Sequence, residues 1–197
     1  NLNNQRDWSY HNYRDSDIDT YEEAALALAD KGYWIFRMGK AVNDPFMADH
    51  PHIIDYALSP HRSDFLDIWL MANCFFCISN STGLDEVSVI FQKPLIKSNM
   101  LPFGLTNTYS NCITVPKHLI WKDTNKRLFL SEHLSHPHLR SDLYKKNKIL
   151  IQELTSKEIL QAVLEMESRL TGSLVDSDED IQLQSLFWKM FKQWPKY

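Results

Sequence analysis

The chain has 197 residues, a net charge of −4 and a hydrophobic fraction of 44%. This size and apolar content suit one domain with a sizeable core, and the acidic balance excludes the basic footprint of a nucleic-acid-binding protein. No apolar run reaches the roughly 18 residues that a membrane span needs. The three cysteines are an odd number, which argues against a disulfide framework and predicts a cytoplasmic, reducing location. The chain opens on polar residues without a Met, so we expect it to be the later part of a longer protein.

In the first half, helical patterns alternate with short apolar runs. Residues before Asp19 are polar and irregular, and a helix is expected from about Asp19 to Lys31, capped by Asp19 or Thr20 and ended by Gly32. The elements expected next are strands over 33–37 and 53–56, a helix over 62–73, a strand over 75–78, a helix over 85–91 and a strand over 94–96. This alternation predicts βαβ crossovers and a parallel sheet.

The second half is expected to be mostly helical. A polar loop is predicted over 99–111, a charged helical pattern after Lys117, an amphipathic helix over 158–170 and a closing aromatic helix over 181–194. We therefore predict an α/β fold in which a Rossmann-like parallel sheet is flanked by helices. Residues 1–150 would form the Rossmann-like domain, and residues 151–197 a C-terminal helical extension that packs on it.

The most informative stretch begins at Cys74. Phe75 to Ile78 form a continuous apolar run, typical of a strand covered on both faces. The residues that follow are small and can expose backbone N–H groups at the start of the next helix, where unpaired donors and the helix dipole favour an anion. The candidate phosphate-binding residues in this turn are Ser79, Ser81, Thr82 and Gly83.

Three arginines are candidate partners for that anion because each is predicted near a strand end or a helix start. They are Arg6, Arg14 and Arg37, and Gly39 closes the strand that carries Arg37. A guanidinium can grip two phosphate oxygens at once, although a surface ion pair is the alternative role for each arginine. Asp85 and Glu86, just after the turn, would oppose an anion or accept hydrogen bonds from a sugar or ribose hydroxyl.

Other chemistries fit the sequence less well. The patterns that resemble metal or redox sites are better explained by packing, capping or exposure; they are Cys74-x-x-Cys77, Asp15-x-Asp17 and the histidines at 133, 136 and 138. No nucleophile elbow, Walker loop or G-x-G-x-x-G is present, which argues against a serine hydrolase, a P-loop and a standard NAD site. We assign no metal and no cofactor.

Several short segments, spread over most of the chain, carry a resemblance that none of them carries alone. They are Arg14–Asp17, Tyr33–Gly39, Ile54–Ala57, Ser63–Asp67, Ile78–Leu84, Pro94, Asn99–Pro102, Thr155–Ile159 and Glu165–Met166. In this order and spacing they resemble a bacterial family of GT-B-type glycosyltransferases, most of them uncharacterised.

The resemblance implies a two-lobed enzyme of which this chain is the C-terminal lobe, binding a nucleotide-sugar donor without an obligatory metal. By position, Ser81, Thr82 and Gly83 would cradle the diphosphate, Arg14 or Arg37 would neutralise it, and Asn99 would shape the neighbouring loop. The missing N-terminal lobe often supplies the catalytic base, which we do not identify in this chain.

The implied activity is sugar transfer to a glycan, such as a surface polysaccharide, or to another hydroxyl acceptor. Two alternatives remain open. One is a sugar-nucleotide epimerase or hydrolase that uses the same donor-binding lobe. The other is a non-catalytic domain that binds a nucleotide-sugar.

Overall fold

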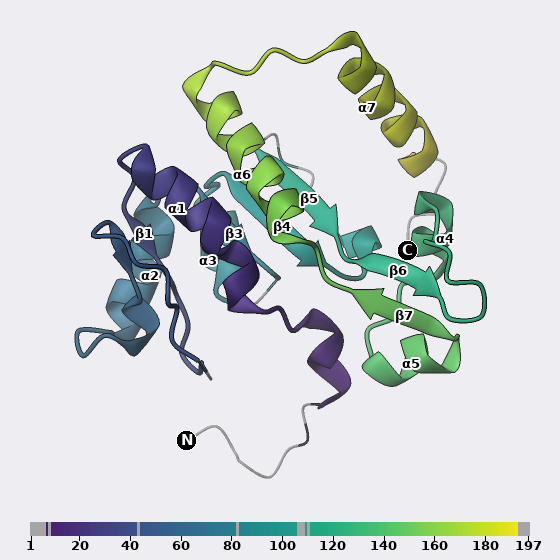
Figure 1. Cartoon of the computed structure of the whole chain (residues 1–197), viewed down its shortest axis with the longest axis horizontal. Coiled ribbons are helices and arrows are strands. Elements are labelled where there is room, and N and C mark those ends of the chain that lie inside the picture. Colours follow the sequence, from purple (N-terminus) through teal and green to yellow (C-terminus); the bar gives the residue numbers. More distant parts are fainter. Residues whose placement is uncertain are drawn as a thin grey trace.

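The structure, a computed structural model, describes residues 7, 9–42, 44–81, 83–105, 109 and 111–192. They form a mixed α/β fold with small parallel sheets and surrounding helices (Figure 1). Short 3-10 helices also occur, at Ser9–Arg14, Ile18–Tyr21, Tyr56–Leu58 and Phe103–Leu105.

The parallel strands are divided between two small sheets. In the first, β1 (Ile35–Phe36) pairs with β2 (Ile53–Ile54). The second has the order β3-β4-β5, with bounds Cys77–Ser79, Leu95–Met100 and Cys112–Pro116. The prediction of parallel strands is therefore confirmed. However, β4 extends into the first two residues of the loop expected over 99–111, and β5, directly after that loop, was not predicted.

Helices cover both faces of the three-stranded sheet. α1 (Glu22–Asp30) and α6 (Ser156–Thr171) pack with Ile96, Ile78 and Ile113 in one core cluster. α2 (Asp64–Asn73) and α3 (Asp85–Ile90) contribute to a second cluster with Cys77, Leu95 and Cys112. Because neighbouring strand residues point to opposite faces, these two clusters lie on opposite sides of the sheet.

The helix ends follow local capping chemistry. Asp17, rather than Asp19 or Thr20, caps the 3-10 turn that leads into α1, and its side chain accepts a hydrogen bond from Asp19 N at 3.0 Å. Thr155 and Glu158 form a capping box at the start of α6. The predicted cap was therefore wrong: the capping side chain lies at Asp17, and a short 3-10 helix separates it from the start of α1.

The expectation of a helical pattern directly after Lys117 was wrong. These residues form β6 (His118–Trp121), which pairs antiparallel with β7 (Ile149–Gln152). Leu119 is buried whereas its neighbours His118 and Ile120 are partly exposed, as expected where successive side chains of a strand point to opposite faces. Two short helices, α4 (Leu130–Ser135) and α5 (Ser141–Lys146), lie between these strands in the sequence. The expected domain boundary at residue 150 falls inside β7.

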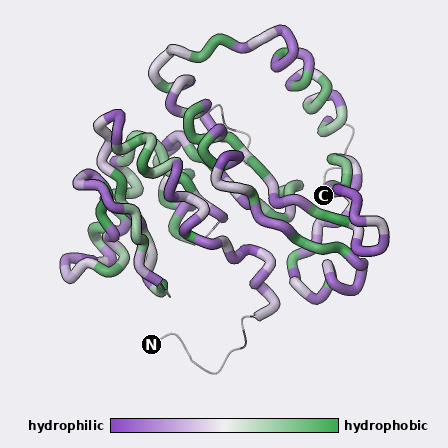
Figure 2. The backbone as a smooth tube through the Cα atoms, viewed as in Figure 1, coloured by the Kyte–Doolittle hydropathy of each residue, from purple (hydrophilic) through white to green (hydrophobic). Residues whose placement is uncertain are grey.

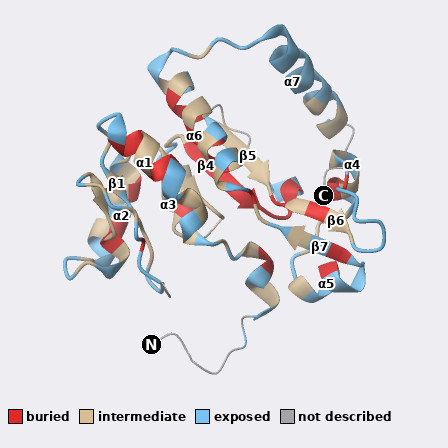
Figure 3. Cartoon of the chain, in the orientation of Figure 1, coloured by how far each residue is buried: buried red, intermediate tan, exposed pale blue. Residues whose placement is uncertain are grey.

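α7 (Asp178–Phe191) stands away from the sheets, beyond an extended connection from α6 (Figure 1). None of its residues is buried, although hydrophobic residues recur along it (Figures 2 and 3). Phe187 and Phe191 touch Phe103, with ring centroids 6.0 and 6.4 Å away. Among the described residues, no helix combines the length and the apolar character needed to cross a membrane.

Candidate functional site

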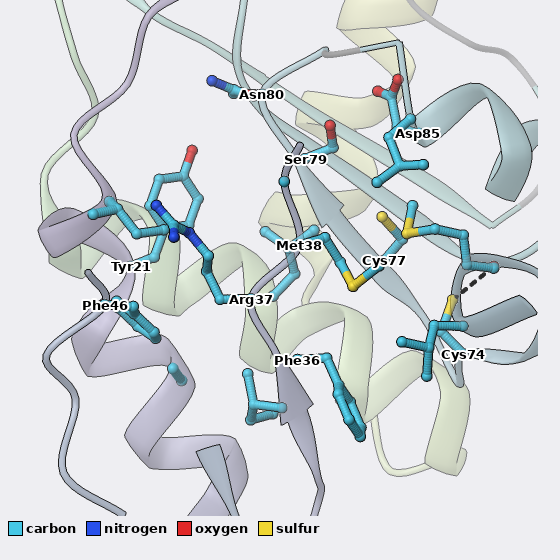
Figure 4. A pocket seen from close by; sticks show the side chains of 18 of the residues that line it. Tyr21, Phe36, Arg37, Met38, Phe46, Cys74, Cys77, Ser79, Asn80 and Asp85 are labelled. Carbon is cyan, nitrogen blue, oxygen red and sulfur yellow. Dashed lines mark hydrogen bonds between the residues drawn. The ribbon is translucent and has the colours of Figure 1, made fainter. Parts of the chain in front are cut away.

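A cavity of about 1400 Å³ lies between β1 and β3. Its walls come from the segment before α1, from β1 and the residues after it, from α2, and from β3 through the first residue of α3. Arg37 and Tyr21 lie on one side of it, and Ser79, Asn80 and Asp85 on the other (Figure 4). The carboxyl ends of both strands therefore open into one space.

β1 and β3 are the edges at which the two parallel sheets approach each other. The described partner of β1 is β2, and that of β3 is β4. Ile35 and Ile78 pack against the α1 and α6 cluster, whereas Met38 and Cys77 belong to the α2 and α3 cluster. Both sheets thus lie between the same two helical layers, with the cavity at the gap.

The turn after β3 is held by its own serine side chains and by Met100 of β4. The Ser79 hydroxyl accepts a hydrogen bond from Ser81 N at 3.1 Å, and Ser81 Oγ donates to Met100 Sδ. Ser81 has a φ of +67°, a left-handed conformation that is uncommon for a residue with a side chain. Gly83 is exposed, and a Cβ added to it would meet no atom within 4 Å. The left-handed bend is therefore made by Ser81 and not by the glycine.

The start of α3 carries a buried carboxylate. Asp85 is only 1% exposed, and burial raises the pKa of its carboxyl, an effect that the Lys97 ammonium opposes. Lys97 Nζ lies 3.8 Å from Asp85 Oδ2 and 3.7 Å from Glu86 Oε1. Lys97 thus offsets part of the negative charge beside the turn. Lys97 was not among the predicted site residues, although a lysine directly after the apolar run at 94–96 was a usable signal.

Arg37, directly after β1, lines the cavity, but its guanidinium already has two partners within the protein. Its Nη1 lies 3.1 Å from Asp55 Oδ1, and its Nη2 donates to the Asp44 carbonyl at 3.0 Å. Gly39, two residues on, has a φ of +156°, and a Cβ there would lie 2.6 Å from Val42 Cγ1. The chain therefore needs glycine at this position to turn away from the strand.

We expect Arg37→Ala to lower the free energy of unfolding by about 1–2 kcal/mol, because it leaves the half-buried Asp55 carboxylate without its charged partner. Asp55 keeps one hydrogen bond, from Phe46 N at 2.9 Å, which limits the loss. Urea unfolding followed by tryptophan fluorescence measures the change. Lys40→Ala is the matched control, since its pair with Asp64 is exposed and should contribute about 0–1 kcal/mol. Equal losses in both variants would contradict a special role for the Arg37 pair.

The cavity brings together some of the predicted residues and leaves others outside. Its lining includes Arg37, Gly39, Ser79 and Gly83 but not Arg14, Ser81 or Asn99. Arg6 and Thr82 lie outside the described residues.

Arg14 and Asn99 each have another local role. The Arg14 carbonyl accepts a hydrogen bond from Asn80 Nδ2 at 3.2 Å, and its Nε donates to the Tyr13 hydroxyl at 2.9 Å. Arg14 is therefore next to the turn, with its side chain directed to Tyr13. Asn99 is fully buried in β4, and its amide oxygen accepts from Leu154 N at 2.8 Å.

Carboxylates outnumber cations on the cavity wall. The cationic residues are Arg37 and Lys40, and the acidic residues are Asp17, Asp19, Asp44, Asp67 and Asp85. Carboxylate oxygens only accept hydrogen bonds, so this lining suits a ligand with many hydroxyl donors in addition to a single anionic group.

Comparisons of the chain with protein-family models, with curated proteins and with solved structures gave no match.

Proposed function

We propose that this chain is the Rossmann-like, donor-binding lobe of a GT-B-type glycosyltransferase. The observation that carries the proposal is the position of the cavity at the carboxyl ends of β1 and β3. If the two separate sheets are counted together across the cavity that β1 and β3 line, the order of the parallel strands would be β2-β1-β3-β4-β5. This is one of the common orders of doubly wound α/β folds, and such folds bind ligands where the order reverses, between the first and third strands.

The donor would lie across this gap. The diphosphate would rest against the turn that follows Ser79, at the start of α3, where backbone N–H groups would donate to it. The buried Lys97, which is not part of the cavity lining, would offset some of the opposing charge of Asp85 and Glu86. Arg37, directly after β1, lies across the cavity from that turn (Figure 4). The wall carboxylates would accept hydrogen bonds from the ribose and sugar hydroxyls.

In the proposed reaction, the bond between the anomeric carbon and the diphosphate oxygen breaks, and an acceptor hydroxyl oxygen forms the new bond to that carbon. The leaving diphosphate keeps the electron pair, and its charge is stabilised by the Arg37 guanidinium and by backbone N–H groups. The hydroxyl proton passes to a general base of the partner N-terminal lobe. The acceptor is a glycan or another hydroxyl compound, and the proposal requires no metal or cofactor.

Gly83→Val tests this placement with little risk to the fold. We expect at least a tenfold loss of nucleotide-sugar affinity, about 1.4 kcal/mol, because the new side chain would occupy the space of the diphosphate. The substitution meets no protein atom at its Cβ, so unfolding should change little. Titration calorimetry with UDP-, GDP- and CMP-sugars measures the affinity.

Gly104→Val is the matched control, because a Cβ at Gly104 also meets nothing within 4 Å and Gly104 does not line the cavity. If the wild-type chain binds none of these donors, or if both glycine variants bind them as the wild type does, the proposed site is refuted. Donor turnover measured with and without acceptor separates a transferase from an epimerase or hydrolase.

A further inference from the structure

Four large aromatic side chains line the same cavity and remain exposed. They are Trp34, Phe36, Trp69 and Phe75, with exposed fractions of 59%, 38%, 50% and 49%. We call these four residues the aromatic wall. Exposed aromatic side chains gathered in one concave place are typical of a binding surface.

Strand geometry explains why Trp34 and Phe36 lie on one side of β1. Ile35, between them, packs against the α1 and α6 cluster. Since side chains alternate along a strand, Trp34 and Phe36 must point to the opposite side, toward α2. Trp69 reaches the cavity from α2 itself.

The cavity also holds a buried carboxylate oxygen that lacks a partner among the described residues. Asp67 is 8% exposed, and its Oδ2 accepts a hydrogen bond from Arg62 Nη2, whereas its Oδ1 has none. Asp85 Oδ2 is a second such oxygen, although Lys97 lies near it. Buried acceptors are costly when unpaired, so these two oxygens indicate places where a ligand would donate.

We propose that the aromatic wall and Asp67 form a subsite for a carbohydrate chain. A sugar ring has C–H bonds on its faces and hydroxyl groups around its edge. The C–H faces suit the electron-rich faces of tryptophan and phenylalanine, and the hydroxyl groups suit carboxylate acceptors. An apolar peptide or lipid chain would cover the wall but leave Asp67 Oδ1 buried without a donor, and a polyanion would meet the acidic lining.

The size of the cavity allows this subsite to exist beside a bound donor. Its volume of about 1400 Å³ exceeds the roughly 300–1,000 Å³ of a common small-ligand pocket. The inference rests on the proposed function in taking this carbohydrate to be the acceptor glycan.

The test begins with the purified chain on an oligosaccharide array, followed by calorimetric titration of the best-bound oligosaccharide without any nucleotide. We expect binding that Trp34→Ala, Trp69→Ala and Asp67→Asn each weaken at least tenfold. The tryptophan side chains are half-exposed, so their removal should leave the fold intact. Circular dichroism verifies folding of Asp67→Asn, which alters the pair with Arg62.

The matched controls are Trp188→Ala, an exposed tryptophan on α7, and Asp64→Asn, an exposed carboxylate on α2; neither residue lines the cavity. Both should bind the oligosaccharide as the wild type does. Absence of oligosaccharide binding overturns the inference. So does oligosaccharide binding that is equally strong in the wild type and in the variants of the aromatic wall. Wall-dependent binding of phosphatidylcholine vesicles in place of oligosaccharides overturns it in favour of an apolar partner. The oligosaccharide titration contains no nucleotide and is therefore independent of the donor titration. If only donor binding fails, the proposed function is refuted and the glycan subsite is not.

Discussion

Replacement of Asn99 by alanine is expected to lower the free energy of unfolding by about 3–4 kcal/mol. Asn99 is fully buried in β4, with a φ of +55°. Its Oδ1 accepts from Leu154 N at 2.8 Å, and its Nδ2 donates to the Tyr21 hydroxyl at 3.3 Å. The side chain thus ties the central strand to the segment before α6 and to the segment before α1.

Two causes contribute to this loss. Alanine leaves the buried Leu154 N–H without an acceptor, which costs about 1–3 kcal/mol, and it holds a left-handed conformation at a further cost of about 1–2 kcal/mol. Urea unfolding measures the total. Asn99→Gly separates the causes, because glycine adopts the left-handed conformation freely and should lose about 1 kcal/mol less than alanine. Near wild-type stability of Asn99→Ala would show that these hydrogen bonds do not support the fold.

The second large effect concerns pH and His133. This residue, on α4, is 8% exposed, and burial lowers the pKa of its imidazole to about 4. His118 and His136 lower that pKa further, whereas Glu132 raises it. The unfolded chain, with a pKa near 6.5, binds the proton more readily, so unfolding becomes easier as the pH falls.

The contribution of the neutral His133 imidazole to the free energy of unfolding is fully present above about pH 6.5 and is lost as the pH falls toward 4. We expect a loss of about 3 kcal/mol between pH 7 and pH 4 from His133 alone. Urea unfolding over this pH range, compared between wild type and His133→Leu, isolates the contribution. His61→Leu is the control, because His61 is exposed and should leave the pH profile unchanged. Parallel profiles for wild type and His133→Leu would contradict the buried neutral imidazole.

Local patterns in the sequence were enough to place α1, α2, α3, β3 and α6 to within a few residues, and to predict parallel strands. The apolar run at 75–78 and the helical spacing at 158–170 depend on neighbours in the chain, which a sequence displays directly. The turn after Ser79 was predicted for the same reason, whereas the presence of Arg37 and Ser79 in one cavity depends on tertiary contacts. The strands β5 to β7 were missed because their pairing depends on partners elsewhere in the chain, β4 for β5 and the distant β6 and β7 for each other.

What the sequence by itself determined is therefore the element types from α1 to β4 and at α6, the parallel pairing and the residues at the ends of β1 and β3. Only the tertiary structure decided that the parallel strands fall into two sheets with a cavity between β1 and β3. It also decided that Asn99 and Lys97 are buried and that the aromatic wall is exposed. The physical reason is that strand pairing and burial depend on contacts between distant segments, whereas periodicity reports only which side chains share a face.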